Sequence, residues 1–183
     1  MPSSTSTLVV FAHPNPDTSR INSALVAQAR DTEHVAVHDL YAAYPEGPID
    51  AEREQRLLVE HDVIVLQFPF YWYSVPPRLK QWLDEVLLEG FAYGAGGDAL
   101  HGKTLQLVTT TGGPEKSYRP DGYNRFTARQ LLLPLDATAH LCGMVYADPL
   151  IFQGVRTYTD EDVAEAGRRY RGLLESTVRT PVS

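Results

Sequence analysis

The segment VVFAHPNPDTSRIN, residues 9–22, is the most informative feature of this chain. Its first four residues are apolar, as in a buried strand, and they lead into a polar loop with two prolines. Ser19 then stands where it can cap a helix that begins near Ile21. Such a junction binds anions, because the first N–H groups of the helix lack acceptors and the positive end of its dipole lies there. Further donors are the side chains of His13, Thr18, Ser19, Arg20 and Asn22.

The junction lacks two common nucleotide-binding motifs, and their absence limits the kind of anion that it could bind. It has neither the lysine of a Walker A loop nor a G-x-G-x-x-G pattern, so it matches neither common nucleotide fingerprint. A hydroxyl-rich, glycine-free loop after the first strand suits instead the phosphate of flavin mononucleotide (FMN), bound at the edge of a doubly wound sheet. The alternative is an ordinary turn in which Ser19 only caps the helix.

The composition is that of a globular protein, with 183 residues, 43% hydrophobic and 21% charged. This length predicts a single domain over 1–183, with residues 1–7 as a flexible amino-terminal tail. The formal net charge of −7 argues against nucleic-acid binding, which requires a basic face. Cys142 is the only cysteine, so an intrachain disulfide is excluded. Because no stretch resembles a signal peptide or a membrane span, we expect a soluble, cytoplasmic protein.

Strand and helix patterns alternate five times along the chain. Apolar runs predict strands at 8–12, 35–40, 63–68, 105–110 and 144–151. Apolar residues at helical spacing predict helices at 21–30, 50–61, 76–87, 126–141 and 159–176. We expect Pro134 to bend the fourth helix and Pro149 to keep the fifth strand at an edge. This order predicts a three-layer α/β domain with a five-stranded parallel sheet of order 2-1-3-4-5 and helices on both faces.

In that topology the loops after the first, third and fourth strands meet in one crevice. The second of these loops has four consecutive aromatic residues, 70–73, which suit the wall of a flat conjugated ring better than open solvent. The third, 109–114, has two glycines that let backbone N–H groups approach the pyrimidine edge of such a ring. Alternatively, the aromatic residues form part of the core or of a subunit contact, and the glycines form a simple turn.

Five segments carry a resemblance to a known family. They are FAHPNPDTSRIN, QFPFYWYSVPPRLKQWLDEVL, GFAYGAGGDALHGK, TTTGGPEKSY and LDATAHLCG, which lie in order within residues 8–170. In these segments the chain resembles the flavodoxin-like NAD(P)H:quinone oxidoreductases, the DT-diaphorase family. Within that family it is most similar to the small bacterial quinone reductases that serve as ancillary subunits of glutathione-gated potassium-efflux systems.

The resemblance implies bound FMN, with the FAD of the larger animal relatives as the alternative, and NADH or NADPH as hydride donor. It also implies a homodimer with the active site at the subunit interface. Phosphate and ribityl contacts would come from His13, Thr18, Ser19, Arg20, Ile21 and Asn22. The ring would be lined by Pro69, Phe70, Tyr71, Trp72 and Tyr73. The polar edge of the ring would face Thr110, Thr111, Gly112 and Gly113.

Tyr118 is the candidate catalytic residue, because it matches a tyrosine that assists charge redistribution in the reduced flavin of DT-diaphorase. The histidine partner of that tyrosine should fall near position 124, where this chain has Tyr123 and Asn124 instead. Tyr118, alone or together with Tyr123, would then donate a hydrogen bond to a flavin or quinone oxygen.

The resulting prediction is an FMN-dependent NAD(P)H:quinone oxidoreductase. Reduced nicotinamide gives a hydride to the flavin and leaves, and a quinone then takes two electrons in the same pocket, which predicts ping-pong kinetics. Two alternatives stay open: a regulatory subunit of a potassium-efflux antiporter, held at the inner membrane by its partner, and a flavodoxin-type electron carrier. Histidines other than His13 show no metal-ligand spacing, so no metal site is expected.

Overall fold

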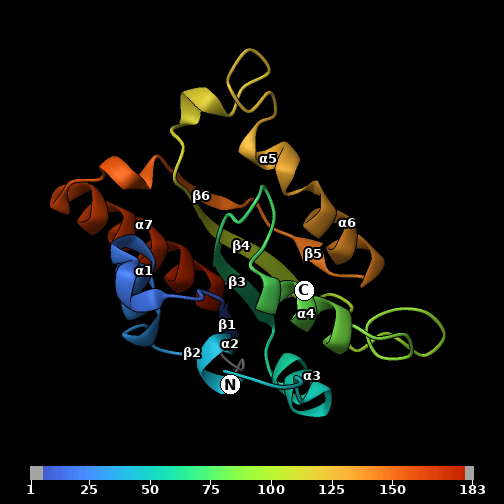
Figure 1. Ribbon diagram of the computed structural model, residues 1–183. Helices are drawn as coiled ribbons and strands as arrows, with labels where there is room; N and C mark the ends of the chain where they lie inside the picture. The colour runs from blue at the N-terminus through green and yellow to red at the C-terminus, as the bar shows by residue number, and fades with distance from the viewer. Residues whose placement is uncertain (1–5, 180–183) are drawn as a thin grey trace.

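The computed structural model describes residues 6–179, with side chains up to residue 177. Its centre is a parallel sheet with helices on both faces (Figure 1). The strands are β1 (Thr7–Phe11), β2 (Val35–Asp39), β3 (Val63–Pro69), β4 (Thr104–Thr111), β5 (Val145–Tyr146) and β6 (Leu150–Gln153). Their order is β2-β1-β3-β4-β5, and β6 also pairs with β4. The predicted order 2-1-3-4-5 is confirmed.

Helices connect the strands, as the alternating pattern predicts. The α-helices are α1 (Arg20–Arg30), α2 (Leu40–Ala43), α3 (Ala51–Val59), α4 (Pro77–Val86), α5 (Ala128–Leu131), α6 (Leu133–Leu141) and α7 (Asp160–Arg179). Short 3-10 helices are η1 (Pro16–Thr18), η2 (Glu115–Ser117) and η3 (Val155–Thr157). At the start of α7, Thr159 and Asp162 exchange side-chain-to-backbone hydrogen bonds, which is the capping pattern seen in the sequence.

The two faces of the sheet carry separate hydrophobic cores. Successive side chains of a strand point to opposite faces, so Val10 packs in one core and Val9 in the other. The first core includes Trp82 of α4, and the second includes Tyr170 of α7, which packs beside α1. β1 and β3 are buried along their whole length because helices cover both faces. This burial explains why both strands are unbroken apolar runs in the sequence.

The last predicted strand, 144–151, is replaced by two strands, β5 and β6, so the sheet has a sixth strand. β5 pairs with the start of β4, and β6 pairs with its end, from Val108 to Thr111. Pro149 lies between β5 and β6, because proline has no backbone N–H to donate to a neighbouring strand. Gln106 of β4 bridges the break, since its Nε2 donates to the main-chain oxygen of Asp148 at 2.9 Å. β6 therefore adds a loop, after residue 153, to the edge where the strands end.

Two other expectations need correction. The helix predicted at 126–141 is divided at Leu132 into α5 and α6, and Pro134 lies in the first turn of α6, where a missing N–H costs nothing. The tail predicted at 1–7 does not reach Thr7, which begins β1. The carbonyl of Ser6 accepts hydrogen bonds from the N–H groups of Asp62 and Val63. Residues 1–5 lie outside the described residues.

A buried carboxylate ties β2, α3 and α4 together on one face. Glu54 of α3 is 1% exposed and accepts hydrogen bonds from Tyr44 Oη at 2.7 Å and Trp82 Nε1 at 2.8 Å. Nε2 of His38, on β2, lies 3.0 Å from the same carboxylate. Burial opposes the ionisation of Glu54, but the hydrogen bonds from these three side chains outweigh it and lower its pKa. Glu54 is therefore a buried anion that holds the elements around it.

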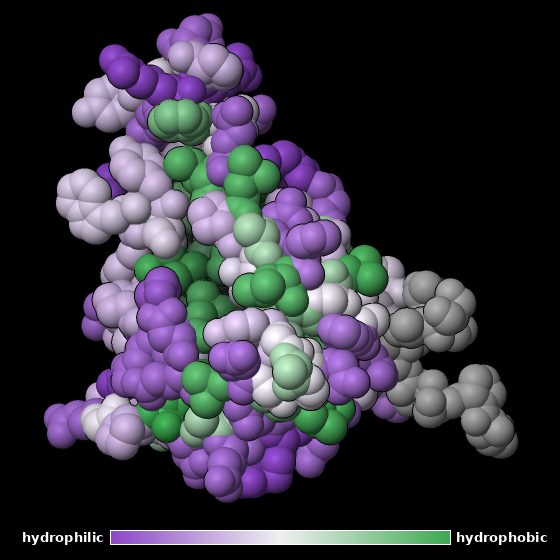
Figure 2. Space-filling view, turned by 90° about the vertical axis from the view of Figure 1, so that its right-hand side faces the viewer, coloured by the Kyte–Doolittle hydropathy of each residue, from purple (hydrophilic) through white to green (hydrophobic). Residues whose placement is uncertain are grey.

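Exposed hydrophobic residues gather on the side of the molecule that carries α5 and α6. Figure 2 looks onto that side and shows hydrophobic residues in a band below the loop at its top. On α6, Leu133 and Leu141 are 56% and 60% exposed. Within residues 6–179, no helix is both long and apolar enough to cross a membrane.

Candidate functional site

The junction of β1 and α1 has the geometry of an anion site. Ser19 is the N-cap of α1, and its hydroxyl accepts from the backbone N–H of Asn22 at 3.4 Å and from its side-chain Nδ2 at 3.0 Å. Arg20 and Ile21 begin the helix, where N–H groups have no acceptor within the helix itself. The hydroxyls of Thr18 and Ser23 donate to loop carbonyls at 3.0 and 2.6 Å and so hold the loop in place. The predicted junction is thus a rigid turn with free backbone donors.

Asn22 links this junction to the loop after β4. The residue is 2% exposed, and its side-chain Nδ2 donates to Thr110 Oγ1 at 3.1 Å, while its main-chain carbonyl accepts from Gln67 Nε2 at 3.2 Å. The side-chain oxygens of Asn22 and Gln67 are both buried without a hydrogen-bond partner among the described residues. An unpaired buried acceptor costs about 1–3 kcal/mol, so both oxygens call for a donor from outside the chain. Hydroxyl groups, such as those of a ribityl chain, are donors of this kind.

His13 lies beside the junction and is 7% exposed. Its Nδ1 accepts from the backbone N–H of Asn15 at 3.1 Å, which in the neutral ring leaves the proton on Nε2. Burial lowers the pKa of His13, and the nearby charge of Asp39 opposes that shift only in part. The ring is therefore a neutral hydrogen-bond donor at neutral pH, suited to a phosphate oxygen.

Arg20 does not point to this junction. Its guanidinium donates to the carbonyl of Tyr158 at 2.8 Å and forms an ion pair with Asp160, at the start of α7. The structure thus brings His13, Ser19 and Asn22 together with the helix start, but it directs the side chain of Arg20 to a neighbouring element.

The aromatic loop after β3 is a tight hairpin. Tyr71 and Ser74 exchange backbone hydrogen bonds at 3.1 and 3.0 Å, so Trp72 and Tyr73 occupy the two central positions of the turn. Both have positive φ, 49° and 62°, as a type I′ turn requires. Phe70 ties the hairpin to the neighbouring strand, because its N–H donates to the carbonyl of Thr110 at 2.9 Å. This turn holds the Trp72 side chain 92% exposed.

The glycine loop after β4 is anchored on both sides. The carbonyl of Gly113 accepts from Thr111 Oγ1 and from the N–H of Gly154, each at 2.8 Å. A Cβ atom on Gly113 would come within 3.2 Å of the Tyr118 ring, so glycine permits this close approach. Tyr118 in turn packs edge-on against Phe70, with ring centroids 6.2 Å apart. The glycine loop and the aromatic hairpin therefore meet at Tyr118.

Tyr118 is buried, and its hydroxyl stays protonated at neutral pH. Burial raises its pKa, while the Thr111 hydroxyl and the charge of Arg156 act in the opposite direction. The hydroxyl is thus available as a hydrogen-bond donor. At the position where the resemblance leads us to expect histidine, Asn124 Oδ1 accepts from Tyr73 Oη at 3.1 Å. Asn124 therefore braces the hairpin.

Arg156 lies against the glycine loop, at a position that the sequence does not reveal. It belongs to η3, directly after β6, and its Nε would lie 2.6 Å from a Cβ atom placed on Gly112. The strand predicted at 144–151 ends too early to place a loop here, so the sequence directs attention to only three loops. The signal that could have found it is Gly154, a turn residue two positions earlier.

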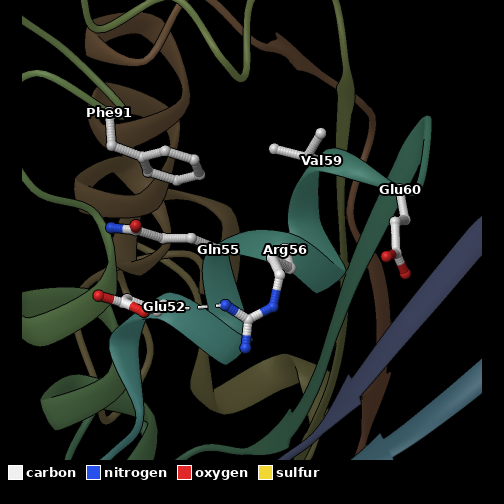
Figure 3. A pocket seen from close by; sticks show the side chains of 6 residues that line it. All are labelled: Glu52, Gln55, Arg56, Val59, Glu60 and Phe91. Atoms are coloured by element: carbon white, nitrogen blue, oxygen red, sulfur yellow. Dashed lines mark ion pairs between the residues drawn. The ribbon is translucent and has the colours of Figure 1, made fainter.

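One pocket on the surface lies away from these loops, and another borders the aromatic hairpin. One of about 390 Å³ lies on α3, at the other end of the sheet, and Glu52 and Arg56 form an ion pair in its wall (Figure 3). The other, of about 370 Å³, is lined by Tyr73 and Val75 of the hairpin and by residues of α4, α5 and α6. Among residues 6–179, no group of three or more His, Cys, Asp or Glu side chains is arranged to hold a metal ion.

A helix start with free donors, an aromatic hairpin and a glycine loop thus converge where β1, β3 and β4 end. This is the arrangement of proteins that bind a phosphorylated planar cofactor at the switch point of a doubly wound sheet. A family profile described as flavodoxin-like fold matches residues 5–174. The chain belongs to the flavodoxin-like NAD(P)H-dependent oxidoreductase family.

Two relatives are similar over almost the whole chain. The glutathione-regulated potassium-efflux system ancillary protein KefG of Cronobacter sakazakii is 47% identical over 167 residues, which is 91% of each chain. The NAD(P)H oxidoreductase YdeQ of Bacillus subtilis is 46% identical over 164 residues, 90% of this chain and 83% of that one.

Solved structures share the fold. General stress protein 14 of Treponema denticola, in complex with FMN, has a TM-score of 0.88 and 39% identity, covering 94% of this chain and 99% of that one. An NADPH-quinone reductase from P. pentosaceus has a TM-score of 0.84 and 31% identity, covering 92% and 97%. A protein named as a thermophilic tryptophan halogenase, from Streptomycin violaceusniger, has a TM-score of 0.89 and 42% identity, covering 91% and 97%. Proteins with this fold have names that indicate different functions, so the function of this chain has to be argued from its site.

The comparisons confirm three predictions made from the sequence. The resemblance to flavodoxin-like NAD(P)H oxidoreductases, the flavodoxin-like α/β fold and the oxidoreductase class are all confirmed.

Proposed function

We propose that this protein is an FMN-dependent NAD(P)H:quinone oxidoreductase that works by a ping-pong mechanism. The observation that carries the proposal is the pair of buried, unpaired oxygens on Asn22 and Gln67, between the helix start and the glycine loop. They need donors that a ribityl chain would supply, at the place where a phosphate and a flat ring would also fit. Similarity to a protein solved with FMN and to one named NADPH-quinone reductase supports the same cofactor and reaction.

In this proposal the β1–α1 junction holds the FMN phosphate. The backbone N–H groups of Arg20 and Ile21 and the dipole of α1 favour the phosphate charge. The Ser19 hydroxyl and the Nε2–H of His13 add donors, while the Thr18 hydroxyl, which donates to the carbonyl of Asn15, holds the loop in shape. Arg20 takes part through its backbone, because its guanidinium is engaged with Asp160. Asn22 faces the ribityl chain.

The aromatic hairpin and the glycine loop hold the ring. Pro69, Phe70 and the hairpin residues Tyr71, Trp72 and Tyr73 provide stacking surface and exclude water from one side. The backbone of Thr110, Thr111, Gly112 and Gly113 faces the pyrimidine edge. Tyr118 donates a hydrogen bond from its protonated hydroxyl at the same edge.

When bound, FMN supplies the hydride and electron chemistry, and the protein supplies orientation and electrostatics. Dipoles that are fixed before the reaction, such as the N–H groups of the glycine loop, stabilise developing negative charge without reorganising. The Tyr118 hydroxyl is held in place by its contacts with Phe70 and Gly113. A nicotinamide and then a quinone would use the same open face of the ring, which is the reason for ping-pong kinetics. The choice between NADH and NADPH stays open in this proposal, and FAD remains the alternative cofactor.

The proposed assembly is a homodimer in the cytoplasm with the active site at the subunit interface. Its support is the exposed hydrophobic surface around the hairpin, where Trp72 and Tyr123 are 92% and 90% exposed. A free monomer would leave this surface in water.

A second candidate function is that of an ancillary subunit of a potassium-efflux antiporter at the inner membrane. Its support is the 47% identity to KefG. Capture of an antiporter by a variant that no longer binds FMN, with transport still activated, would favour this function over quinone reduction. A flavodoxin-type carrier is the third candidate, and stable one-electron reduction on titration would favour it.

The experiment that tests the proposed function is the substitution Tyr118→Phe, with Tyr146→Phe on β5 as the matched control. Loss of a hydrogen-bond donor at the reacting ring should lower the kcat of NADPH-dependent menadione reduction about 10- to 100-fold, while FMN stays bound. Tyr146→Phe should leave kcat unchanged, because Tyr146 lies at the opposite end of the sheet. Unchanged turnover in Tyr118→Phe would show that the role assigned to Tyr118 is wrong.

A further inference from the structure

Arg156 is held against the glycine loop by the backbone around it. The N–H of Gly154 donates to the carbonyl of Gly113 at 2.8 Å, and Gly154 adopts a left-handed φ of 73°. A Cβ atom on Gly154 would lie 3.3 Å from the Cα of Pro114, so the two loops are closely packed. The loop after β6 is therefore fixed relative to the loop after β4.

The guanidinium of Arg156 covers the α-carbon of Gly112. An added Cβ atom there would lie 2.6 Å from Nε and 3.1 Å from Cζ of Arg156, so the exposed arginine side chain would have to move away from the loop. Gly112 has no positive φ that would by itself require glycine. Glycine at 112 thus allows the guanidinium to lie directly against the loop.

The charge of Arg156 is not neutralised by the chain. Among the described residues no carboxylate forms an ion pair with it, whereas Arg20 and Arg129 are paired with Asp160 and Asp148. Its charge reaches the neighbouring tyrosine, where it acts to lower the pKa of Tyr118. A cation without a partner, beside a glycine loop that faces the proposed cofactor, is a candidate for interaction with negative charge on that cofactor.

The position at which relatives of DT-diaphorase would carry a histidine cannot supply that charge here. Asn124 is neutral, and its side-chain oxygen is engaged with Tyr73 Oη. Asn124 thus brings no charge to this edge, whereas Arg156 of η3 does.

We propose that Arg156 is the residue that supplies positive charge at the Gly112–Gly113 edge of the site, where it favours the two-electron reduction of bound FMN. This inference rests on the proposed function, because it takes FMN to be the ligand. It assigns to the loop after β6 a role in setting the electron affinity of the cofactor. Tyr118 then acts as hydrogen-bond donor in the field of Arg156.

The test compares Arg156→Gln, which keeps much of the packing but removes the charge, with Arg156→Lys, which keeps the charge. The midpoint potential of protein-bound FMN is measured by equilibrium titration with a reference dye. If Arg156 stabilises the reduced cofactor about ten-fold, Arg156→Gln lowers the two-electron potential by about 30 mV. Arg156→Lys should restore most of this difference. A distant exposed arginine at the end of α1, changed in Arg30→Gln, is the control and should leave the potential unchanged.

A second readout needs no cofactor. In the apoprotein, the Tyr118 phenol is titrated by NMR of tyrosine labelled with carbon-13 at the ζ position, with the signal assigned by Tyr118→Phe. Arg156→Gln should raise the pKa of Tyr118, and Arg156→Lys should raise it less. Equal potentials and equal Tyr118 titrations in the Gln variant and the wild type would overturn the proposal. Failure of the wild type to bind FMN would overturn the proposed function as well, whereas FMN binding with an unchanged potential would overturn only the role of Arg156.

Discussion

Trp72 and Tyr73 hold a backbone conformation that bulky residues rarely adopt. Both lie at positive φ, and the hairpin bonds between Tyr71 and Ser74 keep them there. Such a conformation costs on the order of 1 kcal/mol or more per residue, and asparagine or glycine would fill the same turn with less strain. A strained turn that exposes an indole ring at 92% is difficult to explain by stability, so it points to a functional role for the ring.

Replacing Trp72 with asparagine should therefore have opposite effects on stability and on binding. We expect Trp72→Asn to raise the free energy of unfolding by about 1 kcal/mol, because asparagine tolerates the left-handed conformation. The same change should weaken FMN binding about ten-fold, because the ring loses part of its stacking surface. Urea unfolding of the apoprotein and fluorescence titration with FMN measure the two effects.

Tyr123→Asn is the control for this prediction. Tyr123 is equally exposed, at 90%, but is not among the residues with positive φ, so its replacement should bring no gain in stability. A loss of stability in Trp72→Asn, or unchanged FMN affinity, would contradict the assignment of a strained functional turn.

At the residue scale, the sequence predicted the types of side chain at the site but not their conformations. Four aromatic residues after an apolar strand indicate a stacking surface for a planar ring, whatever conformation the loop backbone adopts. The positive φ of Trp72 and Tyr73 could not be predicted, because the usual signal for such a turn is Asn-Gly or Asp-Gly. The side chain of Arg20 was also beyond prediction, since Asp160 is 140 positions away in the chain.

At the scale of elements, Glu54 joins β2, α3 and α4 through hydrogen bonds from Tyr44 and Trp82 and the contact with His38. The helix α3 is otherwise rich in charge, and its residue pattern did not indicate that one of its glutamates faces inward. The buried carboxylate thereby links α3 to Trp82, in the middle of α4.

Glu54→Gln should lower the free energy of unfolding at pH 7 by about 2–3 kcal/mol. The side-chain NH2 of glutamine would face a hydrogen-bond donor, and Tyr44 and Trp82 would lose a charged acceptor. The pKa of Glu54 is lowered in the folded state, so its contribution to stability is fully present above the ordinary carboxyl pKa of 4.5. That contribution is lost as the pH falls through the lower, folded-state value. Urea unfolding from pH 7 downward should show the difference between wild type and variant shrinking at acid pH. A difference that does not change with pH would contradict an ionised Glu54.

The elements around the site were predictable where a single rule governs them. Parallel order brought the loops after β1, β3 and β4 together, because the carboxyl ends of parallel strands share one edge. The division of the last strand was not predictable in detail. Pro149 indicated an interruption of the strand. Whether pairing with β4 would end there or resume as β6 depended on Gln106, whose side chain bonds to the main chain at the interruption. The loop with Arg156 depends on that resumption.

At the scale of the whole molecule, the exposed hydrophobic surface is best explained by a second copy of the chain. The hollow beside the hairpin is bounded by α4, α5 and α6, and α6 presents Leu133 at 56% exposure next to it. We expect sedimentation equilibrium to give a mass twice the 20.4 kDa of one chain. Leu133→Lys should shift the protein toward monomer, because it places a charge in the proposed interface.

Val59→Lys is the matched control for the dimer. Val59 is similarly exposed, at 53%, but it lines the hollow on α3, at the other end of the molecule (Figure 3). This variant should remain dimeric. A monomeric wild type at micromolar concentration would contradict the proposed assembly.

In the proposed function the three strand-end loops hold FMN and pass electrons from a nicotinamide to a quinone. The most direct measurement is the visible spectrum of the purified protein after FMN is added and the excess removed, recorded without oxygen during addition of NADPH or NADH and then of menadione. We predict that flavin absorbance is retained, bleaches with the nicotinamide and returns with the quinone. Absence of retained flavin, or retained flavin that neither nicotinamide bleaches, would contradict the proposed function.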